Sequence, residues 1–266
     1  MVAGSLRRQA LAELLGTALL VMAIIGSGIA ASRLSPGNVG LELLENAVAT
    51  GATLVAIILA LGPVSGAHLN PVITLIDRVF HGVSTTAAAV YVVAQVVGAI
   101  AGAVLANLMF SLPAIEVSTK VRAGGGLWLG EVVATFGLAL VVFGVVRSGR
   151  AGLAPFAVGA YITGAYFFTS STSFANPAVA IGRMFSNTFA GIAPSSVPAF
   201  IGFELVGGAV AVVAIWVLYP DAAAVALRVV VPHDADDQRQ TVPGSVSGRT
   251  SSSSGGPRGM EGSEST

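Results

Sequence analysis

Two Asn-Pro dipeptides interrupt a chain that is otherwise mostly apolar. Asparagine is a favoured N-cap and proline is favoured at the first helical position, so each dipeptide predicts the start of a helix. The first turn of a helix carries unpaired N–H groups and a partial positive charge, which repel cations and orient water dipoles. The two motifs, called here the first and second box, are Asn70-Pro71-Val72 in "AHLNPVITLIDR" and Asn176-Pro177-Ala178 in "FANPAVAIGR".

Each box starts a helix that is too short to cross a membrane. About ten residues follow each Asn, over 71–80 and 177–186, and they span roughly 15 Å, about half of a hydrocarbon core. The segments before the boxes, "GPVSGAH" and "SSTSF", must then enter the membrane as irregular backbone. Such backbone is tolerated only inside protein or beside a watery cavity. An isolated Asn-Pro would be an ordinary turn, but a matched pair favours two re-entrant half-helices.

The composition places these motifs in an integral membrane protein. Hydrophobic residues make up 54% of the 266, charged residues only 10%, and the mean hydropathy is +0.84. Thirteen Lys and Arg balance thirteen Asp and Glu, which leaves no basic face for nucleic acid. Nothing resembles a soluble enzyme. The absence of cysteine removes disulfides, thiolate metal sites and cysteine nucleophiles. His81 and His233 have no partner pattern, so we predict no metal site, and we expect no cofactor.

Six apolar segments are long enough to span a bilayer. Since the first follows two arginines and ends in small residues, a cleaved signal peptide is the alternative for that segment. We expect residues 1–8 to be a cytoplasmic N-terminus and residues 220–266, rich in Gly, Ser and Pro, to be a disordered cytoplasmic tail. The predicted spans begin near Ala10, Asn46, Thr86, Leu127, Pro155 and Val197.

The two halves of the chain repeat one pattern. Glu13 is followed by small residues and Thr at the same offsets as Glu131, and Gln95 is followed by small residues at the same offsets as Glu204. Small residues on one helix face allow close helix packing. Each half has three spans, so the second half enters from the opposite side and the repeats are inverted. We place repeat 1 at about 9–108 and repeat 2 at about 127–219.

These motifs resemble the aquaporin, or major intrinsic protein, family over nearly all of residues 8–219. The resemblance rests on "SGAHLNPV", "FANPAVA", "AELLGT" and "GEVVAT". It implies an all-α membrane protein with six transmembrane helices and two re-entrant half-helices in an inverted repeat. The implied function is a passive channel for water and small uncharged solutes that excludes protons and ions. Val72 replaces the usual alanine of the first box, which we expect to change packing more than chemistry.

The resemblance also implies roles for four buried polar residues. Asn70 and Asn176 would face each other at mid-membrane and donate N–H groups to passing water. Glu13 and Glu131 would accept hydrogen bonds from the backbone of the re-entrant loops. The alternative is that these acids, one turn into their spans, simply reach interfacial water.

The expected selectivity filter departs from that of common water channels. Mapping the family pattern outward from the second box gives Thr50, Ser173 and Val179, with either Tyr166 or Gly164 at the fifth-helix position. Most relatives carry arginine where Val179 stands, and glycerol facilitators add an aspartate. Both are missing, so the chain resembles an atypical bacterial-type branch, for which water, glycerol, urea and undissociated metalloid acids are the implied permeants.

Arg183 lies one helical turn beyond Val179 and is a candidate for the outer mouth. A helix over 177–186 would put both on one face, and the arginine could lean inward over Val179. Alternatively Arg183 reaches the headgroups or pairs with a loop carboxylate.

A secondary transporter is the competing function, since transporters share inverted repeats and broken helices. It would need a coupling charge between the boxes, and the sequence has none there. By resemblance we also expect a homotetramer in the cell (plasma or inner) membrane, with both termini cytoplasmic. The positive-inside rule supports this orientation moderately. The arginines on the predicted cytoplasmic side are Arg7, Arg8, Arg147, Arg150, Arg228 and Arg239, and the opposing cations are Arg33, Lys120 and Arg122.

Overall fold

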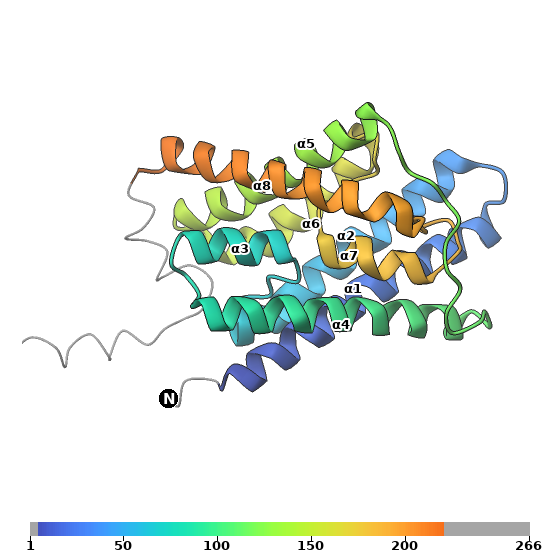
Figure 1. Cartoon of the computed structure of the whole chain (residues 1–266), viewed down its shortest axis with the longest axis horizontal. Helices are drawn as coiled ribbons and strands as arrows, with labels where there is room; N and C mark the ends of the chain where they lie inside the picture. Colours follow the sequence, from blue (N-terminus) through green and yellow to red (C-terminus); the bar gives the residue numbers. More distant parts are fainter. Residues whose placement is uncertain (1–4, 221–266) are drawn as a thin grey trace, which may run out of the picture. The chain divides into compact units, whose positions relative to one another are not determined.

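In the computed structural model, which describes residues 5–220, every regular element is a helix. Six elements are long and apolar enough to cross a membrane, which confirms the predicted spans. The predicted tail lies outside the described residues except for Pro220. The long helices are α1 (Leu6–Leu34), α2 (Val39–Ser65), α4 (Thr85–Met109), α5 (Gly125–Arg147), α6 (Ala154–Phe168) and α8 (Val197–Leu218), and the short ones are α3 (Pro71–Val79) and α7 (Pro177–Gly182) (Figure 1).

The second span begins earlier than its apolar run predicts. Helix α2 starts at Val39, and the side chain of Asn38 accepts a hydrogen bond from the Leu41 N–H at 3.1 Å. A side-chain cap satisfies one of the N–H groups that a helix start leaves unpaired. The polar first turns of α2 are therefore helical, although their composition alone does not mark them as membrane-spanning.

The long helices pair according to the inverted repeat. Helix α1 packs along α4, α5 packs along α8, and α2 crosses α6. At Gly98 of α4, any Cβ would collide with the Leu14 carbonyl of α1; at Gly207 of α8, it would come 2.5 Å from the Val132 carbonyl of α5. The small residues predicted to allow close packing therefore do so in both halves.

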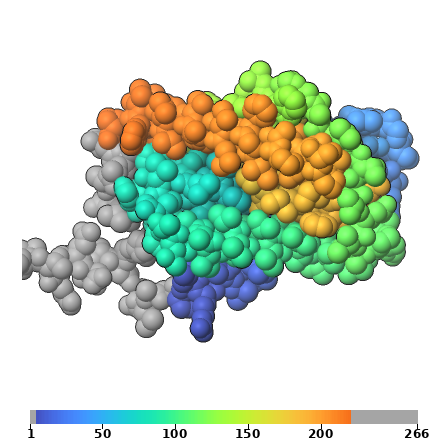
Figure 2. Space-filling view, viewed as in Figure 1, coloured from blue at the N-terminus to red at the C-terminus, as the bar shows by residue number. Residues whose placement is uncertain are grey.

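The two short helices lie between the halves. Helices α3 and α7 contact each other, and each also packs against both α4 and α8. Figure 2 shows them filling the space between α4 and α8 on the face in view. One half-helix from each repeat thus meets the other inside the bundle.

Helix α7 is shorter than the sequence predicts. It ends at Gly182, and residues 183–185 form a 3₁₀ turn rather than a continuing α-helix. The carbonyls of Met184 and Phe185 accept hydrogen bonds from the backbone of Ser118 and Glu116, at 2.8 and 3.2 Å. The connection between α4 and α5 therefore holds this segment in a shape that a local helix signal could not predict.

Candidate permeation site

Both boxes begin helices with asparagine as the N-cap. The Oδ1 atom of Asn70 accepts the Val72 N–H at 2.9 Å, and Oδ1 of Asn176 accepts two N–H groups, at 3.0 and 3.3 Å. Proline is the first residue of each helix. The sequence explains these starts locally, because an Asn oxygen reaches the first-turn amides and proline has no N–H to satisfy.

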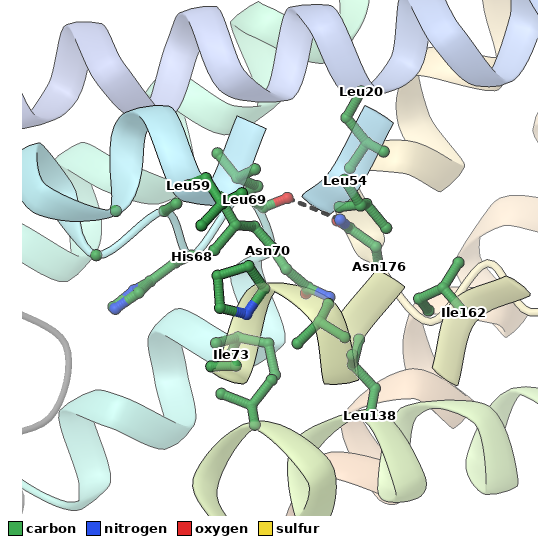
Figure 3. Close-up of a pocket in the computed structure, with 18 of the residues that line it drawn as sticks. Leu20, Leu54, Leu59, His68, Leu69, Asn70, Ile73, Leu138, Ile162 and Asn176 are labelled. Atoms are coloured by element: carbon green, nitrogen blue, oxygen red, sulfur yellow. Dashed lines mark hydrogen bonds between the residues drawn. The ribbon is translucent and has the colours of Figure 1, made fainter. Parts of the chain in front are cut away.

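The amide nitrogens of the two asparagines cross between the loops. Nδ2 of Asn70 donates to the Ala175 carbonyl at 2.7 Å. Nδ2 of Asn176 donates to the Leu69 carbonyl, also at 2.7 Å (Figure 3). Each Asn amide carries two N–H donors, so one on each remains without a partner among residues 5–220. Both asparagines line a cavity, which leaves these donors available to a solute.

The loops that precede the boxes share an unusual backbone conformation. Leu69 and Ala175, each directly before the asparagine, have φ of +51° and +49°, and Ala67 and Ser173, three residues before it, have φ of +47° and +52°. Residues other than glycine rarely adopt this left-handed conformation, which costs of order 1–3 kcal/mol each. Surrounding hydrogen bonds must offset that strain.

Two fully buried acids supply those hydrogen bonds. Glu13 and Glu131 are 0% exposed and do not line the cavity, so neither reaches interfacial water. Each carboxylate accepts two successive N–H groups of the loop in its own repeat. The amides are those of His68 and Leu69 for Glu13, at 2.9 and 2.7 Å, and those of Phe174 and Ala175 for Glu131, at 3.0 and 2.7 Å.

Val72 lies away from the cavity, in the packing behind the first box. It is 2% exposed, and its side chain packs directly on Gly208 of α8. A glycine there leaves room for the larger side chain in place of alanine.

The cavity has a volume of about 450 Å³ and runs between the two halves of the bundle. Its wall extends from the end of α2 and the start of α6 to Thr50 and Val179. Most of the wall is apolar, and Figure 3 shows Asn70 and Asn176 among the apolar side chains of Leu54, Ile162 and Leu138. The apolar side chains include Leu20, Leu54, Ile73, Leu138, Val158 and Ile162.

Four of the five filter candidates line this cavity. Thr50, Tyr166, Ser173 and Val179 all line the cavity, and the Tyr166 hydroxyl donates to Thr50 Oγ1 at 3.2 Å. The structure places Gly164 elsewhere, on the exposed side of α6. The buried Ser173 Oγ has no hydrogen-bond partner among the described residues, so it too can bind a solute.

Comparison with known proteins agrees with this geometry. Residues 2–185 match the Major intrinsic protein family. The chain belongs to this family. Over 216 residues, 81% of this chain and 92% of the relative, it is 49% identical to aquaglyceroporin AqpS of Rhizobium meliloti (strain 1021). It is 34% identical to aquaporin-5 of Sus scrofa over 205 residues, 71% of this chain and 74% of the relative.

The fold is also that of a solved major intrinsic protein. The aquaglyceroporin from Plasmodium falciparum superposes with a TM-score of 0.62, at 20% sequence identity, over 83% of this chain and all of the other. As a major intrinsic protein, the chain is a passive channel for water and small solutes, which decides against the secondary transporter. The resemblance predicted from the two boxes is therefore confirmed.

Arg183 is buried against the loop of the second box. It is 2% exposed, its guanidinium lies over the Phe174 ring at 3.5 Å from the centroid, and its Nε donates to the Ala190 carbonyl. Its burial keeps it from the headgroups, and among residues 5–220 it makes no ion pair with a carboxylate. The α-helix ends at Gly182, so Arg183 belongs to the 3₁₀ turn, and its guanidinium lies over the Phe174 ring.

The sequence analysis missed Arg122 as a neighbour of this site. Its guanidinium lies 5.2 Å from the centroid of the same Phe174 ring, and its Nε donates to the Gly191 carbonyl at 2.9 Å. Burial lowers the pKa of Arg122, and the nearby Glu131 offsets part of that effect. No sequence signal links residue 122 to residue 174, since the connection between α4 and α5 follows no regular pattern.

Proposed function

We propose that this major intrinsic protein conducts water and small uncharged polyols such as glycerol, and excludes protons. The cavity carries the proposal: it has an apolar wall facing a few hydrogen-bonding groups. A polyol can turn its hydroxyls toward the amides of Asn70 and Asn176 while its CH groups contact Leu54 and Ile162. The aquaglyceroporin name of the relative at 49% identity agrees with this solute class.

Thr50, Tyr166, Ser173 and Val179 are the proposed filter. Ser173 and Thr50 supply hydroxyls, while Val179 supplies an apolar surface that offers no hydrogen bonds. Without an arginine at this wall, solutes larger than water do not meet a guanidinium that would narrow the passage and compete as a cation. This favours neutral solutes such as glycerol and urea, and it extends to undissociated metalloid acids.

Proton exclusion follows from the two half-helix starts. The N-termini of α3 and α7 carry partial positive charge and meet near the asparagines. That field opposes cations and protons and turns water dipoles in opposite directions on its two sides. Among the described residues that line the cavity, none is Asp, Glu, Lys or Arg.

The assembly and orientation belong to the same proposal. We infer a homotetramer in the inner membrane with both termini cytoplasmic, a channel domain over 9–219, and no enzymatic activity. The family resemblance supports the tetramer, and the arginine distribution supports the orientation. Cross-linking in membranes and protease access from each side test these two points.

Purified protein in liposomes tests the permeant. Shrinkage in an impermeant osmolyte measures water flux, and reswelling in glycerol, urea or arsenous acid measures solute entry. We expect fluxes that follow each gradient, with glycerol entry well above that of protein-free liposomes and no proton current. Glycerol entry at the protein-free rate would overturn the solute assignment, and accumulation against a gradient would overturn the passive mechanism.

A further inference from the structure

At one buried position the two halves differ in residue type, with a neutral amide in the first half and a carboxyl group in the second. Gln95 of α4 and Glu204 of α8 occupy the same place in their halves, and both are 0% exposed. Each lies beside the acid that holds the re-entrant loop, Glu13 or Glu131. The first half therefore serves as an internal reference for the second.

In the first half the amide of Gln95 supplies a donor to the acid. Its Nε2 lies 2.7 Å from Oε2 of Glu13 and 3.0 Å from the Thr74 hydroxyl. Glu13 thus receives a side-chain hydrogen bond in addition to those from its loop. An ionised carboxylate is stabilised in a buried place when donors surround it.

In the second half a carboxyl group stands where that donor should be. Oε1 of Glu204 accepts the Asn176 N–H at 3.1 Å, directly after the Phe174 and Ala175 amides that Glu131 accepts, so the two carboxyls hold three successive amides of one loop. Oε2 of Glu204 is buried and has no donor among residues 5–220. Two ionised carboxylates in contact would repel strongly in this low-dielectric interior.

We propose that Glu204 is a neutral carboxylic acid that carries its proton on Oε2 and donates it to Glu131. The proton belongs on Glu204 because both oxygens of Glu131 already accept loop amides. Protonated in this way, Glu204 donates a side-chain hydrogen bond to Glu131, as the Gln95 amide donates one to Glu13. It is then a positioning residue for the second box, since its other oxygen holds the Asn176 backbone.

The charged neighbours of Glu204 are few. Helix α5 presents Glu131, which favours the neutral form, and Arg183 follows α7 and favours the ionised form. Helix α3 presents the apolar side chains of Val72 and Ile76 to α8 at Gly208. Glu204 does not line the cavity, so its proton is structural and not part of a proton path.

Infrared spectroscopy of the reconstituted full chain tests this proposal directly. At about pH 7 exposed carboxyls are ionised, so a protonated acid gives its own carbonyl stretching band, which shifts in deuterium oxide. We expect this band in the wild type, its loss in Glu204→Gln, and its displacement in Glu204→Asp. The reciprocal variant Gln95→Glu should gain a second band, because it places the same acid pair in the first half.

Stability against pH gives an independent readout. A folded protein that holds a proton which the unfolded chain releases above about pH 4.3 loses stability as pH rises beyond that value. The unfolding midpoint of the wild type should therefore fall with rising pH more steeply than that of Glu204→Gln. A wild-type spectrum without a deuterium-sensitive carboxylic band overturns the proposal even if Glu204→Gln fails to fold. A band that persists unchanged in Glu204→Gln also overturns it.

Discussion

The first and second re-entrant segments share one backbone device but sit in different surroundings. Both have an asparagine N-cap, left-handed residues at matching positions and an acid behind the loop. Helix α3 continues for nine residues, whereas α7 stops after six and passes into a 3₁₀ turn. The connection between α4 and α5 contacts the second segment and brings Arg122 to Phe174.

This difference separates two parts of the channel. One is its frame, meaning the re-entrant loops, the half-helices and the buried acids that hold them, and the other is its selectivity filter. The frame is duplicated, because it depends on backbone amides, small residues and buried acids that both halves possess. The proposed filter is not duplicated, because Ser173 and Val179 come from the second segment and line the cavity together with Thr50 and Tyr166. Variants placed at equivalent positions of the two halves can therefore test the frame and the filter separately.

The largest expected effect comes from removing the loop acids. Glu13→Ala and Glu131→Ala each leave two buried loop amides unpaired, at about 1–3 kcal/mol per amide. Glu13→Ala should be worse, since Glu13 also accepts the Ser65 hydroxyl, which has no counterpart at Glu131 among residues 5–220. Thermal unfolding in detergent and the yield of monodisperse protein measure this order. Equal destabilisation would contradict the asymmetry seen in the two networks.

The box asparagines should give the next largest effect. Asn70→Ala and Asn176→Ala each remove a helix cap and a cross-loop hydrogen bond, and we expect a loss of about 1–3 kcal/mol. Asn176→Ala should cost more, because its oxygen caps two amides where that of Asn70 caps one. Both variants should also lower water flux per folded protein. A larger loss of stability in Asn70→Ala than in Asn176→Ala would mean that the number of capped amides does not decide which variant is less stable.

Val179 tests the filter without touching the frame. Val179→Arg should lower the ratio of glycerol to water entry about tenfold, or about 1.4 kcal/mol, because the guanidinium narrows the pore and supplies donors that water can use. Val179→Ile, which matches Ile73 at the equivalent position of the first half, adds size without charge. It should change the ratio less. If Val179→Arg leaves every solute-to-water ratio unchanged, the constriction lies elsewhere.

Arg183 and Arg122 should have smaller effects. Each guanidinium stacks on Phe174, and such contacts contribute about 0.5–2 kcal/mol. We expect Arg183→Ala to alter the glycerol-to-water ratio about threefold or more. Arg122→Ala should alter it less, because Arg122 is more exposed and lies farther from the ring. Unchanged water, glycerol and urea permeabilities in Arg183→Ala would contradict a role for Arg183 at the outer mouth of the pore.

The smallest expected effect is that of mercury reagents on the wild type. The sequence contains no cysteine, so no thiol is available for mercury to block. Val179→Cys should gain a block that a thiol reductant reverses, and Ile73→Cys compares the same position in the first half. Reversible block of the wild type, in liposomes free of other channels, would contradict this account of the pore surface.

Much of the frame could be predicted from local signals. Apolar runs identified six spans, and Asn-Pro marked both half-helix starts, because hydrophobicity and capping act within a few neighbouring residues. The same signals misplaced the start of α2 and the end of α7. Caps at Asn38 and backbone pairing between residues 116–118 and 184–185 override the local pattern there.

The site itself was predictable only in part. Family spacing narrowed the fifth-helix position to Tyr166 or Gly164, but the choice depends on how α6 is rotated in the bundle. Arg122 carried no signal, because its partner Phe174 belongs to a different loop. A sequence pattern records periodicity along one element and not the contacts between elements.

The sequence by itself determined that this is an integral membrane protein, that it repeats a unit of three spans, and that two of its helices start with Asn-Pro. Those features follow from composition, length and local hydrogen bonding. Only the tertiary structure decided that each asparagine donates to the opposite loop, that Tyr166 faces Thr50, and that Glu204 meets Glu131. The Asn70 and Ala175 partners, for example, lie 105 residues apart in the chain. Such pairings arise from helix packing, which brings distant polar groups together where each must find a partner away from water.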